Sequence, residues 1–158
     1  MECLLIGGAQ TVGKSETIYR LANRLLSKGF VIVSGSIPST FGDFRCILEG
    51  INKLGMNVKI IINSPSDNVP IINNFKAFYD SNGAIYDIFV SSVRDGGFYP
   101  RNDFFNIMQI NNINNSILEL PLGKINRRRG NFLIALTWYQ NQVDNLIDNI
   151  LLNQPFNL

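Results

Sequence analysis

The residues from Gly8 to Ser15 constrain the fold of this chain more than any other stretch. They include two glycines, which allow a tight loop, and they read Gly8-Ala9-Gln10-Thr11-Val12-Gly13-Lys14-Ser15. The preceding apolar run, Cys3-Leu4-Leu5-Ile6, is typical of a buried strand. Residues 15 to 27 have helical spacing, with apolar residues at Ile18, Leu21, Ala22 and Leu25. The sequence therefore predicts a strand, a glycine loop and a helix in succession.

The loop matches the pattern G-x-x-x-x-G-K-[S/T] at every fixed position. On this motif, over residues 3 to 27, the chain resembles the P-loop NTPase superfamily. The resemblance implies that backbone N–H groups and the helix start surround the phosphates of a nucleoside triphosphate. It also implies that Lys14 reaches the β- and γ-phosphates and that Ser15 ligates Mg²⁺. The nucleotide-binding residues expected in this segment are Gly8, Ala9, Gln10, Thr11, Val12, Gly13, Lys14, Ser15 and Glu16.

Length and composition favour one domain over residues 1–158, because 158 residues with 46% hydrophobic content can bury one substantial core. The chain contains no histidine, which excludes imidazole as a base, nucleophile or metal ligand. Phosphoryl transfer is compatible with this restriction, since it depends on backbone amides, lysine, arginine and Mg²⁺.

Charge and cysteine content indicate a cytoplasmic protein. A net charge of +2 with dispersed basic residues gives no indication of nucleic-acid binding. No apolar run is long enough for a membrane span, and Met1-Glu2 leads directly into the first strand, which leaves no room for a signal peptide. Cys3 and Cys46 lack metal-ligand spacing, and we expect them to be buried thiols in a reducing compartment.

Further strands and helices alternate along the chain. Strands are predicted at 30–34, 58–62, 84–91 and 116–120, the first of these buried, and helices at 43–54, 69–81 and 103–110. A long final helix follows, with Asn131 as its N-cap. The pattern predicts an α/β fold of the P-loop NTPase type: a three-layer, doubly wound, mostly parallel five-stranded sheet. Ligands are expected at the carboxyl ends of its strands.

Within the superfamily, the layout favours small nucleotide or metabolite kinases over regulatory GTPases. The guanine-reading pattern N-K-x-D has no match, because Asn52-Lys53-Leu54-Gly55 lacks the aspartate. At the start of the predicted 43–54 helix, Asp43 either orients an acceptor hydroxyl or caps the helix. Arg45 nearby either holds an anion or is solvated.

Arginines in two loops are candidate ligands for phosphate or base. Arg94 and Arg101 flank a Gly-Gly pair after the 84–91 strand, as in a lid that closes on the transferring phosphoryl group, although ordinary surface arginines would have the same spacing. Arg128, within the trio 127–129, either stacks on adenine or belongs to a solvated turn.

The expected metal-binding acid is missing from its usual place. P-loop enzymes carry an aspartate, the Walker B residue, at the end of a hydrophobic strand, but the 58–62 strand is followed by Asn63. Asp67 comes four residues later and either approaches the metal or caps the next helix. Asp87 within the 84–91 strand, or Asp95 after it, could substitute, depending on strand order.

These observations lead to one main hypothesis and two alternatives. The main hypothesis is a small phosphotransferase that uses ATP and Mg²⁺ with a nucleotide or small metabolite as acceptor, with Lys14, Asp43, Arg94 and Arg101 as catalytic residues and Ser15 and Asp67 at the metal. The first alternative is an ATPase or nucleotide-dependent switch that acts on a protein partner. The second is a nucleotide-binding module with little turnover.

Overall fold

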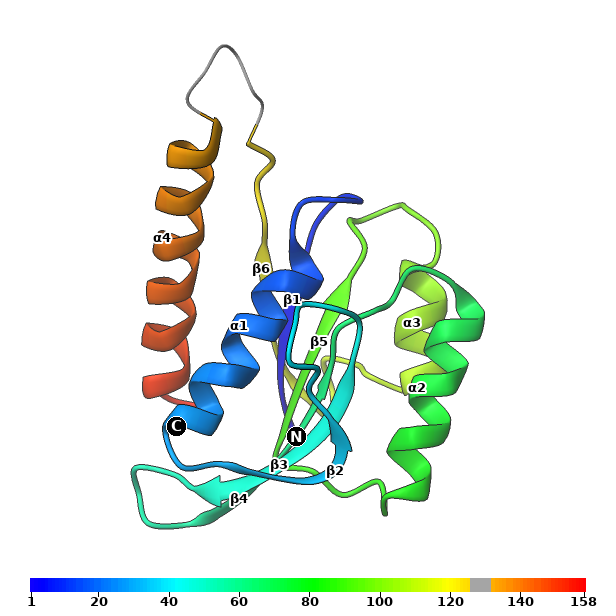
Figure 1. The fold of residues 1–158 in the computed structure, drawn as a ribbon. Helices are drawn as coiled ribbons and strands as arrows, with labels where there is room; N and C mark the ends of the chain where they lie inside the picture. The colour runs from blue at the N-terminus through cyan, green and yellow to red at the C-terminus, as the bar shows by residue number, and fades with distance from the viewer. Residues whose placement is uncertain (126–131) are drawn as a thin grey trace.

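The structure is a computed structural model that describes residues 1–125 and 132–158. Within these residues, six strands form one sheet in the order β2-β3-β4-β5-β1-β6, and four helices cover its faces (Figure 1). The strands are β1 (Glu2–Gly7), β2 (Val31–Ser36), β3 (Arg45–Ile51), β4 (Asn57–Asn63), β5 (Ile88–Val93) and β6 (Ser116–Pro121). The helices are α1 (Lys14–Ser27), α2 (Val69–Ser81), α3 (Arg101–Met108) and α4 (Phe132–Leu152).

The sheet is mixed, with three parallel and two antiparallel strand pairings, and it has one more described strand than expected. β1 lies between β5 and β6, parallel to both, and β5 is also parallel to β4. β3 runs antiparallel to both of its neighbours, β2 and β4. The prediction of an α/β fold is confirmed, whereas the five-stranded sheet is corrected to a six-stranded one.

The extra strand β3 occupies the region where a helix was predicted over residues 43–54. Its buried residues alternate between the two faces of the sheet, since Cys46 and Leu48 join one hydrophobic cluster and Ile47 joins the other. This period of two is that of a strand. The helix prediction was wrong because a short apolar run fits either structure until its neighbours are known.

Strand β2 is an edge strand, although its apolar sequence predicted a buried one. It pairs with β3 on one side, and no described strand pairs with its other side. Val31 is 58% exposed and Val33 is 47% exposed. β2 is exposed because it lies at the edge of the sheet, and local sequence does not specify that position.

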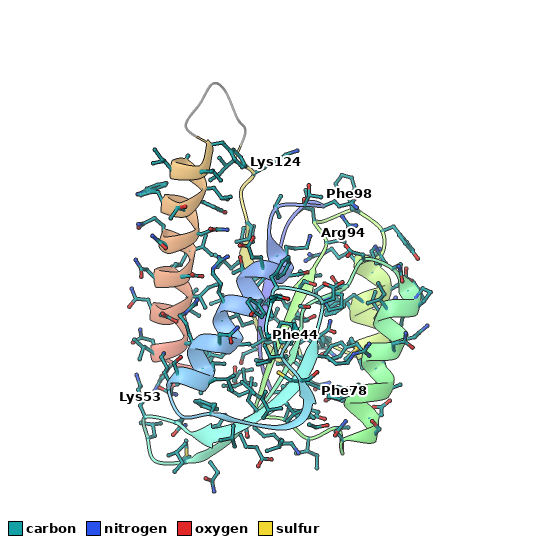
Figure 2. All side chains as sticks on the ribbon, viewed as in Figure 1. Phe44, Lys53, Phe78, Arg94, Phe98 and Lys124 are labelled. Carbon is teal, nitrogen blue, oxygen red and sulfur yellow. The ribbon has the colours of Figure 1, made fainter. Side chains whose placement is uncertain are left out.

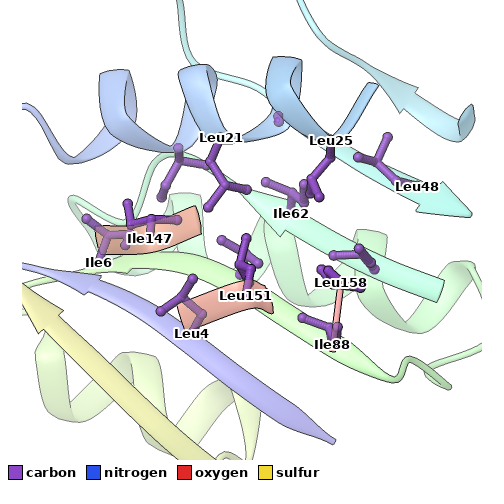
Figure 3. Packing of buried hydrophobic residues seen from close by; sticks show 14 of the residues in the cluster. Leu4, Ile6, Leu21, Leu25, Leu48, Ile62, Ile88, Ile147, Leu151 and Leu158 are labelled. Carbon is purple, nitrogen blue, oxygen red and sulfur yellow. The ribbon is translucent and has the colours of Figure 1, made fainter. Parts of the chain in front are cut away.

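Two hydrophobic clusters on opposite faces of the sheet make the fold three-layered. Figure 3 shows the first cluster, in which α1 and α4 pack on Leu4, Ile6 and Ile62. In the second cluster α2 and α3 pack on the other face, around residues that include Phe75, Phe89 and Phe104. Burial of one such side chain is worth about 1.5–3 kcal/mol, so both layers contribute strongly to stability.

Several local predictions are confirmed within the described residues. α2 begins and ends at the predicted residues, 69 and 81, and the buried cysteines Cys3 and Cys46 are reduced. Burial raises the pKa of each thiol to about 12. Asn131, the expected cap of α4, lies outside the described residues. Among the helices that are described, none has the length and apolar character needed to cross a membrane.

Candidate functional site

The loop between β1 and α1, which we call the glycine-rich loop (Gly8–Gly13), adopts backbone conformations that require its glycines. Gly8 has φ 141° and Gly13, the N-cap of α1, has φ 93°. A Cβ atom on Gly8 would lie 2.8 Å from Val12 Cγ2 and 3.2 Å from the carbonyl oxygen of Leu122. Thr11 also has a positive φ, 64°. The loop therefore curls tightly, in a way that side chains at residues 8 and 13 would oppose.

The start of α1 follows the glycine-rich loop directly, and its first backbone N–H groups have no hydrogen-bond acceptor within the helix. Gly13 has no side chain that could cap the helix, and no side-chain cap is present among the described residues. The first N–H groups of a helix have no partner within the helix and carry partial positive charge. This end of α1 is therefore suited to an anion.

Lys14 in the first turn of α1 is buried and folds back onto the loop. Its Nζ donates hydrogen bonds to the carbonyl oxygens of Gly8, at 2.8 Å, and Ala9, at 2.7 Å. Burial lowers the pKa of Lys14, and the positive charge of Arg94 lowers it further, while Asp67 and Asp95 raise it. The ammonium group is thus held beside the loop and within the electrostatic influence of Arg94.

Ser15 connects α1 to the carboxyl end of β4. Its hydroxyl donates to the carbonyl oxygen of Ser64 at 3.0 Å, and the Ser64 hydroxyl accepts from the backbone N–H of Phe44 at 2.8 Å. Asp43 precedes Phe44 in an exposed loop before β3 rather than at a helix start. The helix-capping alternative for Asp43 is therefore wrong, and its role as a base stays a prediction.

Asp67 pairs with Arg94 across the carboxyl ends of β4 and β5. Arg94 Nη2 lies 3.1 Å from Asp67 Oδ1, with the Asp67 side chain 50% exposed and that of Arg94 14% exposed. Asn68 caps α2, since its Oδ1 accepts from the backbone N–H of Ile71 at 3.0 Å. The alternative that Asp67 caps this helix is therefore wrong.

The strand next to β1 on this side is β5, not β4, and its last three residues, Ser91, Ser92 and Val93, carry no charge. Ser91 and Ser92 are buried there, and the Ser92 hydroxyl donates to Ser66 Oγ at 2.8 Å. Asn63 at the end of β4 donates to Ser91 Oγ at 3.2 Å, and its buried Oδ1 has no partner among the described residues. Hydroxyl and amide groups therefore occupy the place where a carboxylate was expected.

Asp87 does not belong to this site. It precedes β5 rather than lying within it, and its carboxylate accepts from the backbone N–H of Lys59 at 2.8 Å. Ile88 pairs with Glu2 at the start of β1, so Asp87 lies at the amino ends of these strands. Asp95, in contrast, follows β5 at the carboxyl end.

Arg101 is bound to β6 rather than free in a lid. Its guanidinium donates to both oxygens of Glu119, with Nη1–Oε1 at 2.9 Å and Nη2–Oε2 at 2.6 Å. This hydrogen bonding raises the pKa of Arg101. Nη1 also donates to the carbonyl oxygen of Arg94 at 2.6 Å, so Arg101 supports the backbone at Arg94. Arg128 lies outside the described residues.

A cavity of about 360 Å³ brings many of the predicted residues together. It is lined by Gln10, Thr11, Gly13, Lys14, Ser15, Glu16, Phe41, Asp67 and Ser92. A smaller cavity of about 160 Å³ lies between the start of α1 and α4, where Glu16 accepts a 2.9 Å hydrogen bond from Gln140. The predicted nucleotide-binding segment therefore borders a cavity at the carboxyl ends of the strands.

The residues around the larger cavity do not form a magnesium site of the expected kind. The Asp67 carboxylate is engaged by Arg94, and the end of β5 supplies hydroxyls. Within residues 1–125 and 132–158, no group of three or more acidic, cysteine or histidine side chains could hold a metal ion. The loop conformation and Lys14 suit a polyphosphate chain, whereas the acidic residues do not suit its usual metal.

Comparison of the chain with protein-family models, with curated proteins and with solved structures gave no significant match.

Sequence reasoning missed three residues that shape the site. Ser92 could have been identified only with the strand order, which places β5 beside β1. Ser64 and Glu119 are separated from their partners Ser15 and Arg101 by 49 and 18 residues, respectively. No local spacing connects residues so far apart.

Proposed function

We propose that this chain binds the phosphates of a nucleoside triphosphate at the glycine-rich loop. The observation that carries the proposal is the positive φ of Gly8, Thr11 and Gly13 in a loop that leads from β1 into the uncapped start of α1, with Lys14 in its first turn. Backbone amides, helix charge and an ammonium group are the donors that phosphate requires. The motif resemblance to P-loop NTPases points to the same ligand.

We further propose that the chain transfers a phosphoryl group to a small acceptor. The acceptor oxygen would form a bond to the γ-phosphorus of ATP while the bond from that phosphorus to the β-phosphate oxygen breaks, and ADP would be the leaving group. Lys14 and Arg94 would stabilise the negative charge of the transferred phosphoryl group, and Asp43 would accept the proton of an acceptor hydroxyl. Support comes from the loop before β3, since Phe41 lines the cavity and Asp43 follows it closely in the chain.

Binding is tested by calorimetric titration of ATP into the wild-type protein and the Lys14→Ala variant. We expect Lys14→Ala to weaken ATP binding at least about tenfold, because a charge-assisted contact to phosphate is lost. Lys28→Ala is the matched control, since Lys28 is exposed at the opposite end of α1. Equal affinities of the Lys14→Ala variant and the wild type would contradict the proposal.

Transfer is tested separately, by incubating the protein with γ-labelled ATP and a panel of nucleosides, nucleotides and small hydroxylated metabolites. A labelled acceptor product that is absent with Lys14→Ala would support phosphotransfer. ATP binding without any acceptor product across the panel would contradict phosphotransfer while leaving nucleotide binding intact.

A nucleotide-dependent binding protein with slow turnover is the second candidate. The uncharged carboxyl end of β5 favours it, because Ser91 and Ser92 occupy positions where a metal-organising carboxylate would assist hydrolysis. Tight ATP binding with negligible hydrolysis at saturating Mg²⁺ would support this candidate.

A further inference from the structure

The charged side chains that line the larger cavity are Lys14, Glu16 and Asp67, and Arg94 forms an ion pair with Asp67. In the parallel register of β1 and β5, Gly7 lies opposite Val93, so Arg94 leaves the sheet at the level of Gly8. Figure 2 labels Arg94 at this end of the sheet, near the glycine-rich loop. Burial is the main cause of the lowered pKa of Lys14, and the positive charge of Arg94 lowers this pKa further. Two cationic groups therefore lie near the start of α1. Within β5 the neighbouring side chains Ser91 and Ser92 are uncharged, and the Asp95 carboxylate follows in the next loop.

The Arg94 side chain is largely buried, and one of its N–H donors has no hydrogen-bond partner among the described residues. The side chain is 14% exposed, and the buried donor is Nε. The fork between Arg101 and Glu119 fixes the backbone beneath it, because Arg101 Nη1 donates to the Arg94 carbonyl oxygen. A guanidinium carries five N–H donors in a planar arrangement that suits carboxylate and phosphate equally. Arg94 is thus ordered in advance for an oxyanion.

Asp67 is the oxyanion that Arg94 contacts in the free protein. Its side chain is half-exposed and lines the same cavity as Lys14 and Ser15. Water screens an ion pair with a half-exposed partner, which makes such a pair easy to exchange. A phosphate oxygen that enters the cavity would therefore compete directly with this carboxylate for the guanidinium.

We propose that Arg94 is a phosphate ligand and that Asp67 occupies its place in the free protein, so that a triphosphate binds without a divalent cation by displacing the Asp67 carboxylate. This inference rests on the proposed function, and it names the ligand form: the metal-free polyphosphate. Lys14 and Arg94 together supply the positive charge that a metal ion would otherwise bring. Ser91 and Ser92 in β5 fit this arrangement, since carboxylates at those two positions would repel an unmetallated phosphate.

The test is calorimetric titration of inorganic triphosphate, and of ATP, in EDTA and in Mg²⁺. We expect wild-type protein to bind both ligands in EDTA. Arg94→Gln should weaken binding in EDTA about tenfold or more, because a charge-assisted contact is lost. Asp67→Asn should tighten binding in EDTA about three- to tenfold, because the competing carboxylate is removed. Since Asp67 is half-exposed, its variant keeps the test valid even if Arg94→Gln folds poorly.

Matched controls come from the ion pair between Lys76 and Asp80 on α2, which are separated by 2.6 Å. Lys76→Gln and Asp80→Asn remove the same types of charge away from the cavity and should leave triphosphate affinity unchanged. Parallel shifts in these controls would mean that net charge alone explains the effect, and would overturn the inference.

Two other results overturn the inference and separate its failure from that of the proposed function. Binding that requires Mg²⁺ and is weakened by Asp67→Asn would make Asp67 a metal ligand and leave the nucleotide site intact. No binding in either medium, with Lys14→Ala indistinguishable from wild type, would remove both the proposed function and this inference.

Discussion

At the scale of single residues, the glycine-rich loop depends on the absence of side chains at Gly8 and Gly13. A positive φ excludes most side chains on energetic grounds, and at Gly8 a Cβ atom would also meet Val12 and the backbone of Leu122. The backbone dihedral angles and the contact with Val12 are local constraints, which is why the sequence could place a glycine loop here, whereas the contact with Leu122 depends on the tertiary structure. The partners of polar residues were less predictable: Asp67 contacts Arg94 rather than capping α2, and Arg101 contacts Glu119.

The Gly8→Ala variant tests this dependence. We expect it to lower the free energy of unfolding by about 1–3 kcal/mol, through backbone strain and steric overlap, and to weaken ATP binding. Chemical denaturation gives the first quantity and calorimetry the second. Gly96→Ala is the control, because a Cβ atom there meets nothing within 4 Å. Wild-type stability of Gly8→Ala would show that the loop tolerates a side chain.

At the scale of elements, α4 is attached to α1 by an ion-pair network as well as by apolar contacts. Asp144 on α4 lies 2.8 Å from Arg20 Nε and 3.1 Å from Arg24 Nη1, and Asp148 lies 3.0 Å from Arg24 Nε. Glu16, which lines the larger cavity, contacts Gln140 on α4 and Arg20 on α1. The position of α4 is thus coupled to the start of α1, where we propose that phosphate binds.

Removal of the Asp144 charge should loosen this attachment. We expect Asp144→Asn to lower the free energy of unfolding by about 1–2 kcal/mol, because two partly buried arginines lose a charged partner. Asp80→Asn should cost less than about 0.5 kcal/mol, since it affects a pair on the surface of α2. Urea denaturation measures both, and equal effects of the two variants would contradict the structural role of the network.

At the scale of the whole molecule, two hydrophobic layers share one sheet. Ile147 on α4 belongs to the layer on one face and Ile72 on α2 to the layer on the other, both at most 1% exposed. Strands β1, β4 and β5 contribute side chains to both layers in alternation. Because the strands connect the layers, we expect the chain to unfold as one cooperative unit.

The variants Ile72→Val and Ile147→Val test this expectation. Each should cost about 0.5–1.5 kcal/mol, and the double variant should cost about their sum because the two sites share no contact across the sheet. Fluorescence and circular dichroism should report a single coincident transition in denaturant. Separate transitions, with each variant shifting only one, would indicate that the layers unfold independently.

Local patterns predicted the β1–loop–α1 unit, the limits of α2 and the burial of both cysteines, because each depends on backbone conformation or periodicity over a few residues. Strand β3 and the exposed edge position of β2 could not be predicted in this way, since a short apolar run is compatible with a helix or with any place in a sheet. The order β2-β3-β4-β5-β1-β6 was equally inaccessible to local analysis. It places the hydroxyls of β5, rather than the end of β4, beside β1.

The same distinction applies to the candidate site. The run from Gly8 to Ser15 carries its own loop geometry and its own lysine, so the sequence was enough to locate the proposed phosphate-binding segment. Which charged side chains lie near this segment depends on the tertiary structure. Asp67 follows β4 in the chain, and Arg94 follows β5. The two side chains meet because β4 and β5 are parallel neighbours in the sheet, so their carboxyl ends lie together. Strand pairing over long separations decided which charged groups surround the loop, and no short-range pattern encodes that pairing.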